Sequence, residues 1–291
     1  MSQTIPVFLH IPKNAGTYVL SITKKMLRFY AIEQGWANRP NWNFDLRIIN
    51  VMDENNKQPI TLLIRDLYGS RFDTNSVQPY PGNKHTDVLN LKDLDIVLDL
   101  IKDNKIFLFC LFIQPRGVKF LKDNFYEKIF EKINKTPCYF TIFRHPYKRA
   151  LSLYNYITSD NSKHEPTHGT IKAKTFEEYI GSNQLNQSWL IQNLCDIRDG
   201  SCITENQFKQ ACSILSKFKI EDISNTDKLI DSVFTECYNI TRSIMKDCNN
   251  ISKNTTKNTE IEFESLNKET RKNFSERTKF DRRLYNRFIK H

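Results

Sequence analysis

Residues 8–17 read Phe-Leu-His-Ile-Pro-Lys-Asn-Ala-Gly-Thr, the pattern of a strand, a tight turn and the start of a helix. Val7 to Ile11 is an apolar run rich in strand formers, which suits a strand buried in a parallel sheet. Pro12 ends this strand, and apolar residues from Val19 to Tyr30 recur at helical spacing. A strand, a turn and a helix in this order are the unit that binds a phosphate on the N-terminus of the helix.

The turn itself, formed by Lys13, Asn14, Ala15, Gly16 and Thr17, has the composition of an anion-binding loop. Ala15 and Gly16 carry almost no side chain, so backbone N–H groups can approach an anion closely. Lys13 is a mobile positive charge at the mouth of the turn, and Thr17 is placed to cap the helix. The spacing of a Walker A loop is absent. Taken alone, the segment is equally compatible with an ordinary strand, turn and helix whose lysine is solvated.

A second segment, residues 138–154, has the same design. Cys138 to Phe143 has the pattern of an apolar strand, and a helical pattern begins near Tyr147. Arg144, at the end of the strand, can form two hydrogen bonds to a phosphate. Ser152 follows a little over two helical turns later. This second segment favours the phosphate-binding interpretation of the first over an ordinary strand, turn and helix.

Together the two segments resemble the nucleotide-binding segments of sulfotransferases that use 3′-phosphoadenosine 5′-phosphosulfate (PAPS). The subgroup that the chain most resembles contains the heparan sulfate 2-O- and 6-O-sulfotransferases and their bacterial relatives. The resemblance implies that Lys13 and Thr17 belong to the loop for the 5′-phosphosulfate, and that Arg144 and Ser152 hold the 3′-phosphate. It implies further nucleotide contacts from the rest of the first turn and from a polar stretch at residues 186–190, namely from Asn14, Ala15, Gly16, Ser188 and Trp189.

Two further residues of the second segment have open roles. Arg149 matches a further arginine of the family, whose role is either structural pairing or contact with the ligand. His145 occupies a position where the family often has an acidic or polar residue, and we interpret it as a loop residue without a catalytic role.

The alternation of strand and helix patterns predicts an α/β fold. The resemblance implies that this is a P-loop-like three-layer fold, with a central parallel sheet flanked by helices. We expect strands near residues 6–11, 60–65, 106–112, 138–143 and 218–223, and helices near 17–30, 92–103, 119–133, 147–157, 175–181, 184–195, 204–216, 226–236 and 265–289. Residues 1–291 are expected to form a single domain. We assign acceptor specificity to residues 31–105, which match the family poorly, and a basic C-terminal helix to residues 265–291.

The general base of the predicted reaction has no clear candidate. In the heparan-type relatives a histidine on or just after a central strand takes the proton of the acceptor hydroxyl. The corresponding run, residues 106–117, contains no histidine. His85 resembles a lysine-histidine element of some bacterial members and is the first candidate, with Asp87 to orient it or to serve instead. A histidine in a surface loop is an equally good interpretation of His85.

Composition restricts the remaining possibilities. Seven cysteines include no C-x-x-C pair and no zinc-ligand spacing, and without a signal peptide free thiols are favoured. The first strand begins by about residue 6 and no apolar run approaches the roughly 20 residues of a membrane span, so we expect a soluble, cytoplasmic protein. The net charge is +10, and residues 271–291 hold eight basic residues against two acidic ones.

The resemblance implies a PAPS-dependent sulfotransferase that needs no metal, releases 3′-phosphoadenosine 5′-phosphate (PAP) and acts on a carbohydrate hydroxyl. The basic segment would attract an acidic polysaccharide, although a solvated helix face explains it as well. A nucleic-acid partner is disfavoured, because no zinc finger, RNP-type pattern or helix-turn-helix accompanies the charge. The alternatives are a P-loop nucleotide phosphotransferase and a non-enzymatic protein that binds polyanions.

Overall fold

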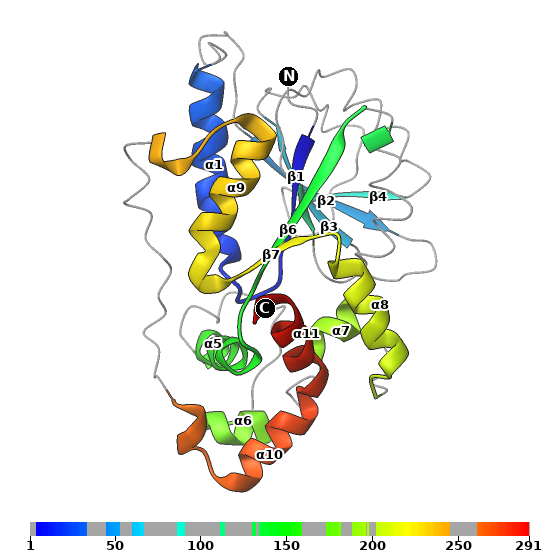
Figure 1. Cartoon of the computed structure of the whole chain (residues 1–291), viewed down its shortest axis with the longest axis vertical. Helices are drawn as coiled ribbons and strands as arrows, with labels where there is room; N and C mark the ends of the chain where they lie inside the picture. The colour runs from blue at the N-terminus through cyan, green and yellow to red at the C-terminus, as the bar shows by residue number, and fades with distance from the viewer. Residues whose placement is uncertain are drawn as a thin grey trace.

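A mixed β-sheet of seven strands runs through the upper part of the molecule, and helices lie beside and below it (Figure 1). The computed structural model of the 291-residue chain describes residues 4–33, 45–52, 60–66, 86–90, 111–113, 130–131, 134–158, 173–181, 188–195, 197, 202–244 and 261–290. Within these residues the chain has the α/β character that its alternating pattern predicts.

The strands lie in the order β4-β2-β3-β5-β1-β6-β7. Strands β5, β1, β6 and β7 run parallel, whereas β3 is antiparallel to both β2 and β5, and β4 is parallel to β2. The predicted parallel sheet is therefore correct for the four strands around β1 and β6. The strand bounds are β1 Thr4–Leu9, β2 Asp45–Met52, β3 Ile60–Asp66, β4 Thr86–Asn90, β5 Leu111–Ile113, β6 Thr136–Phe143 and β7 Lys219–Asp222.

Of the described helices, α1 and α9 pack on one face of β1 and β6, α7, α8 and α11 pack on the other, and α5, α6 and α10 form a separate cluster. Their bounds are α1 Gly16–Glu33, α5 Pro146–Thr158, α6 Phe176–Gly181, α7 Trp189–Leu194, α8 Glu205–Leu215, α9 Thr226–Tyr238, α10 Lys268–Arg277 and α11 Lys279–Ile289. Short 3₁₀ helices occupy Ile223–Asn225, Arg242–Ile244 and Phe263–Ser265. Figure 1 shows α1 and α9 side by side along one flank of the sheet, where the two helices contact each other.

Strands β1 and β6 are buried on both sides because their side chains alternate between two apolar clusters. Phe8 and Phe140 pack with α1 and α9 on one face, with their ring centroids 5.1 Å apart. Leu9 and Phe143 belong to the second cluster, which contains residues of α7, α8 and α11. The continuous apolar runs that predicted these two strands follow directly from this two-sided burial.

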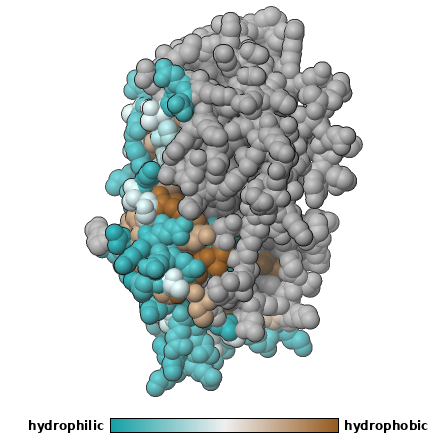
Figure 2. Space-filling view, turned by 90° about the vertical axis from the view of Figure 1, so that its right-hand side faces the viewer, coloured by the Kyte–Doolittle hydropathy of each residue, from teal (hydrophilic) through white to brown (hydrophobic). Residues whose placement is uncertain are grey.

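A third apolar cluster lies below the sheet, between α5, α6 and α10 (Figure 1). Tyr147 and Phe274 are its centre, with ring centroids 5.7 Å apart. Phe274 is the buried residue of α10, whose sequence is otherwise mostly charged or polar. On the face that Figure 2 shows, the coloured residues at the lower end are mostly hydrophilic.

The structure corrects three expectations about the elements. Strands β2 and β4 were not predicted, because they lie in the region where only residues 60–65 stood out as a strand pattern. The helix expected over 265–289 is divided into α10 and α11 at Thr278. Helix α1 begins at Gly16, one residue earlier than expected. The expected helix at 92–103, most of the one at 119–133 and residues 106–110 of an expected strand lie outside the described residues.

Two sequence-based expectations concern membranes and thiols. None of the helices in the described ranges has both the length and the apolar character needed to cross a membrane. Five cysteines are free thiols in the structure, namely Cys138, Cys195, Cys202, Cys212 and Cys237. Cys138 is buried, as its apolar strand predicts. Cys110 and Cys248 lie outside the described residues.

Candidate functional site

The turn between β1 and α1 has a backbone conformation that is unusual for its residue types. Lys13 has a φ of 67° and Ala15 a φ of 60°, whereas neither Asn14 nor Gly16 has a positive φ. A non-glycine residue in the left-handed region costs about 1–2 kcal/mol. Both Lys13 and Ala15 carry this energetic cost, so other contacts must stabilise the turn.

Those contacts come from the end of β6. Asn14 is buried, and its Nδ2 donates a hydrogen bond to the Ile142 carbonyl oxygen at 2.8 Å. Arg144 donates from Nη1 to the Lys13 carbonyl oxygen at 3.2 Å. The structure therefore brings the two predicted segments together, and Asn14 serves as a structural link between them.

Gly16 lies against the ring of His10. A Cβ added at Gly16 would stand 2.0 Å from Nε2 of His10, far inside any allowed contact. Burial lowers the pKa of His10, which keeps its imidazole neutral at pH 7. His10 therefore packs locally against the turn. The space beside the Gly16 Cα, expected to give an anion close access, is filled by His10.

Thr17 is the second residue of α1 and is exposed. Its carbonyl oxygen accepts a hydrogen bond from the Ser21 hydroxyl at 2.9 Å. The expected capping position thus shifts to Ala15, whose carbonyl accepts from the Val19 N–H at 3.0 Å. The first turn of α1 contains no acidic residue, so nothing there repels an anion.

Helix α5 connects the second segment to the first. Arg144 and His145 precede it, and Ser152 is buried in its middle. Tyr156 lies one turn beyond Ser152, on the same side of the helix. The ammonium group of Lys13 stands 3.8 Å above the centroid of the Tyr156 ring. The face of α5 that carries Ser152 therefore borders the turn that carries Lys13.

Arg144 is half-buried at this junction. Burial lowers the pKa of its guanidinium group, and the carboxylate of Asp222 opposes that effect. The guanidinium group stays protonated at pH 7, because an arginine loses its proton only far above that pH. Arg144 thus places a permanent positive charge beside the Lys13 turn.

Of the two roles left open for Arg149, structural pairing is the one that the structure shows. Its guanidinium group is 3.8 Å from Oδ2 of Asp281 and lies over the ring of Trp189, 4.7 Å from the centroid. The same Asp281 oxygen accepts from the N–H of Leu190 at 3.2 Å. Burial raises the pKa of Asp281 and the charge of Arg149 opposes this rise, so the pair compensates a charge that is otherwise costly inside a protein.

Ser188 and Trp189 mark the start of α7. Ser188 has a φ of 44°, and both its N–H and its hydroxyl donate to the Arg277 carbonyl oxygen, at 3.1 and 3.2 Å. Trp189 contacts Arg149 of α5. With the bond from Leu190 to Asp281, these contacts connect α7 to α5, α10 and α11. The expectation that Ser188 and Trp189 also contact a nucleotide stays a prediction.

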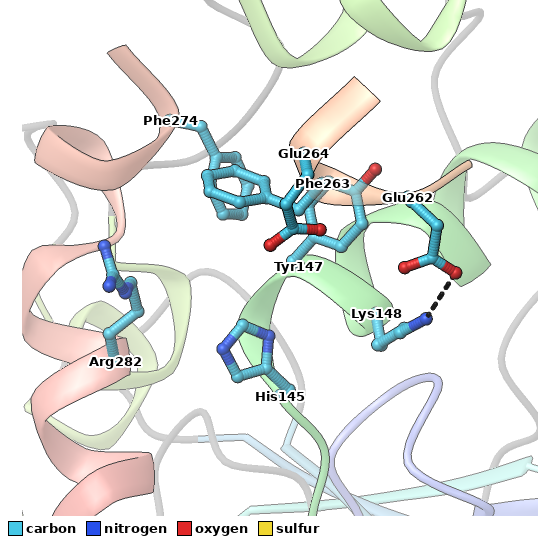
Figure 3. Close-up of a pocket in the computed structure, with 8 residues that line it drawn as sticks. All are labelled: His145, Tyr147, Lys148, Glu262, Phe263, Glu264, Phe274 and Arg282. Atoms are coloured by element: carbon cyan, nitrogen blue, oxygen red, sulfur yellow. Dashed lines mark ion pairs between the residues drawn. The ribbon is translucent and has the colours of Figure 1, made fainter. Parts of the chain in front are cut away.

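A pocket of about 400 Å³ opens beside the N-terminus of α5 (Figure 3). Lys148 on one rim pairs with Glu262 at 3.8 Å, and Arg282 of α11 stands on the opposite side. Eight residues line it: His145, Tyr147, Lys148, Glu262, Phe263, Glu264, Phe274 and Arg282. Sequence reasoning missed this pocket, because its walls come from segments more than 110 residues apart and carry no shared motif.

His145, which borders this pocket, has an imidazole pKa that is lowered by burial and by the cations Arg282, Lys290 and Lys148. Its ring meets that of Tyr285 edge-on, with centroids 5.3 Å apart. Tyr285 in turn donates its hydroxyl to Asp222 at 2.7 Å. These contacts connect the end of β6 to α11.

Two predictions fall outside what the structure describes or tests. His85 lies outside the described residues, directly before β4, so its candidacy as the base stays a prediction. Among the residues that are described, no group of three or more His, Cys, Asp or Glu side chains is arranged to hold a metal ion.

Sequence reasoning also missed Tyr156 and the pairing partner of Arg149. The spacing of four residues from Ser152 to Tyr156 is a signal that was available, whereas nothing in the sequence connects Arg149 with Asp281.

Comparisons with protein-family models, with curated proteins and with solved structures gave no match to this chain.

Proposed function

We propose that this protein is a sulfotransferase that moves a sulfuryl group from PAPS to a carbohydrate hydroxyl, on a P-loop-like three-layer α/β fold. The observation that carries the proposal is the hydrogen bond from Arg144 to the Lys13 carbonyl, which joins residues 131 positions apart. Segments that resemble the 5′-phosphosulfate and 3′-phosphate sites of one family are thus in direct contact.

The turn has the backbone pattern of an anion site. Lys13 and Ala15 are left-handed and alternate with residues of ordinary φ, a pattern in which backbone N–H groups can form a concave nest for an anion. The Asn14 N–H is used within the turn, where it donates to the Ile11 carbonyl oxygen at 3.2 Å. The first N–H groups of a helix lack acceptors within the helix and carry a partial positive charge. Both effects favour an anionic group in front of α1.

The side chains around the turn suit the two phosphate groups of the nucleotide. Lys13 supplies a point charge at the 5′ group, where it stabilises negative charge that builds up as the sulfuryl group leaves. Arg144 has five N–H donors, and its bond to Lys13 uses one of them. Its other donors, with the Ser152 hydroxyl, are our proposed ligands of the 3′-phosphate. PAPS, when bound, supplies the sulfuryl group.

The acceptor that we propose is a glycan, with an acidic polysaccharide as the first candidate. The basic residues of α10 and α11 attract such a chain, but exposed charges are screened beyond about 8–10 Å at physiological salt. They therefore cannot select one hydroxyl. We assign that selection to residues 31–105 and removal of the hydroxyl proton to His85.

Labelled PAPS offered with neutral sugars, acidic polysaccharides, tyrosine peptides and small phenols tests this function. We expect label on a saccharide, full activity in excess EDTA, and loss of transfer in a folded Lys13→Ala variant. Strict magnesium dependence with ATP as donor would favour the phosphotransferase. Polyanion binding without any transfer, unchanged by Lys13→Ala, would favour a binding protein.

A further inference from the structure

Tyr156 receives the charged end of Lys13. The Nζ atom stands 3.8 Å above the centroid of the Tyr156 ring, well inside the 6 Å within which a cation and an aromatic face attract each other. The negative face of the ring is directed at the ammonium group, and both residues belong to the junction between the first turn and α5. In the sequence, only its spacing of four residues from Ser152 connects Tyr156 with the site.

Lys13 is thereby held at both ends. Its carbonyl oxygen accepts from Arg144, its backbone is in the left-handed region, and its ammonium group lies on the Tyr156 ring. A lysine side chain has four rotatable carbon–carbon bonds and loses up to about 2 kcal/mol of entropy when it is fixed. A ring that fixes it in advance removes much of that loss from any later step that uses the charge.

The ring is itself on a well-anchored helix. Arg149 of α5 pairs with Asp281 of α11, and the Tyr147 hydroxyl donates to the Ile261 carbonyl oxygen at 2.8 Å. Tyr154 donates to the Lys174 carbonyl oxygen at 3.0 Å. These three contacts therefore anchor the helix that carries the Tyr156 ring.

The location of the contact along α5 is informative. Ser152 and Tyr156 are four residues apart, which places them on one side of the helix and about 6 Å apart along its axis. The residue whose ring contacts the Lys13 ammonium group is thus one helical turn from the residue whose hydroxyl is proposed to hold the 3′-phosphate.

We propose that Tyr156 is a positioning residue that holds the Lys13 ammonium group beside the anionic group in front of α1. This inference rests on the proposed function, because Lys13 matters to the reaction only if its charge faces the leaving phosphate. Tyr156 acts through Lys13 and touches neither the sulfuryl group nor the acceptor. Its ring, and not its hydroxyl, carries the effect.

The contact is tested first by NMR of protein whose lysines carry ¹³C-methyl groups from reductive methylation, which keeps their charge. The Lys13 signal is identified by its loss in Lys13→Arg. We expect ring current from Tyr156 to move this signal upfield in the wild type and in Tyr156→Phe, and the shift to vanish in Tyr156→Leu. An unshifted wild-type signal would overturn the contact. If Tyr156→Leu lowers the melting temperature, Tyr156→Met replaces it.

The role is tested by steady-state transfer from PAPS. We expect Tyr156→Leu to lower kcat about 5- to 30-fold, the range that corresponds to the 1–2 kcal/mol of a partly desolvated cation–aromatic contact. Tyr156→Phe should keep kcat, because it keeps the ring. Normal kcat in Tyr156→Leu, or a Tyr156→Phe variant as slow as Tyr156→Leu, would overturn this inference alone. A wild type that neither turns over PAPS nor binds PAP would overturn the proposed function instead.

Discussion

Gly16 has room for a hydrogen atom on its Cα and for nothing larger, because His10 fills the adjacent space. Both residues belong to the strand, turn and helix that carry Lys13, so the packing of Gly16 against the His10 imidazole stabilises the turn. The predicted reason for this glycine, access for an anion, differs from the reason in the structure, which is packing.

We predict that Gly16→Ala destabilises the protein by about 1–3 kcal/mol, as overpacked sites do. Chemical denaturation followed by circular dichroism measures the change. Gly181→Ala is the matched control, since nothing lies within 4 Å of a Cβ at Gly181 and the residue ends helix α6. Equal effects of the two substitutions would show that the His10 contact is unimportant.

His145 predicts a dependence of stability on pH. Burial and the neighbouring cations Arg282, Lys290 and Lys148 lower its pKa below 6.5, against a weaker opposing effect of Asp222. The folded protein then binds fewer protons than the unfolded chain. The contribution of His145 to stability is therefore complete above about pH 6.5 and is lost as the pH falls toward the folded pKa.

His145→Gln should flatten the decline in unfolding free energy between pH 7 and pH 5. One proton limits the change in slope to about 1.4 kcal/mol per pH unit, and the partial exposure of the ring keeps it below that limit. Urea titrations of both proteins at several pH values measure it. Parallel curves would contradict the assigned cause. His10, whose pKa is also lowered, contributes to both curves alike.

Among single residues, the sequence predicted those that belong to a local motif. Lys13, Arg144 and Ser152 stand out because each follows a strand or occupies a helix at a fixed spacing from a turn. The pairing of Arg149 with Asp281 joins residues 132 positions apart and leaves no local pattern. Only the fold brings them into contact.

Among the elements, helix α8 shows how far local chemistry specifies a boundary. Thr204 accepts from the N–H of Gln207 at 3.3 Å, and the Gln207 side chain accepts from the N–H of Thr204 at 2.8 Å. This reciprocal capping box starts the helix at Glu205, close to its predicted start.

Thr204→Ala should lower the unfolding free energy by about 1 kcal/mol, because it removes one side of the capping box. Thr204→Ser, which keeps the hydroxyl, should stay within a few tenths of a kcal/mol of the wild type. Thermal unfolding of the three proteins under identical conditions measures both changes. A serine variant as unstable as the alanine variant would show that the hydroxyl is not the cause.

The C-terminal helices show where local pattern fails. Phe274 and Leu284 both fit one continuous helical repeat, yet they belong to different apolar clusters. The chain bends at Thr278, whose buried hydroxyl donates to the Phe274 carbonyl oxygen at 2.8 Å. Which apolar cluster each residue joins depends on tertiary packing, and periodicity does not contain that information. Periodicity alone therefore predicted one helix.

In the whole molecule, β1 and β6 are neighbours and run in the same direction, so their carboxyl ends reach the same edge of the sheet. Ligands of open α/β sheets bind at such an edge. The alternation of strands and helices predicted this arrangement. It did not predict that β3 runs antiparallel, because strand direction depends on connections and pairings that no single segment records.

The central claim is that the Lys13 turn and the start of α5 form one site for a nucleotide with phosphates at both its 5′ and 3′ positions. Isothermal titration with PAP and with adenosine monophosphate tests it most directly. We predict that the wild type binds PAP about 10- to 150-fold more tightly, which corresponds to the 1.5–3 kcal/mol of a charged hydrogen-bonding contact. Arg144→Ala should remove most of this preference. Equal affinities of the wild type for the two nucleotides would contradict the claim.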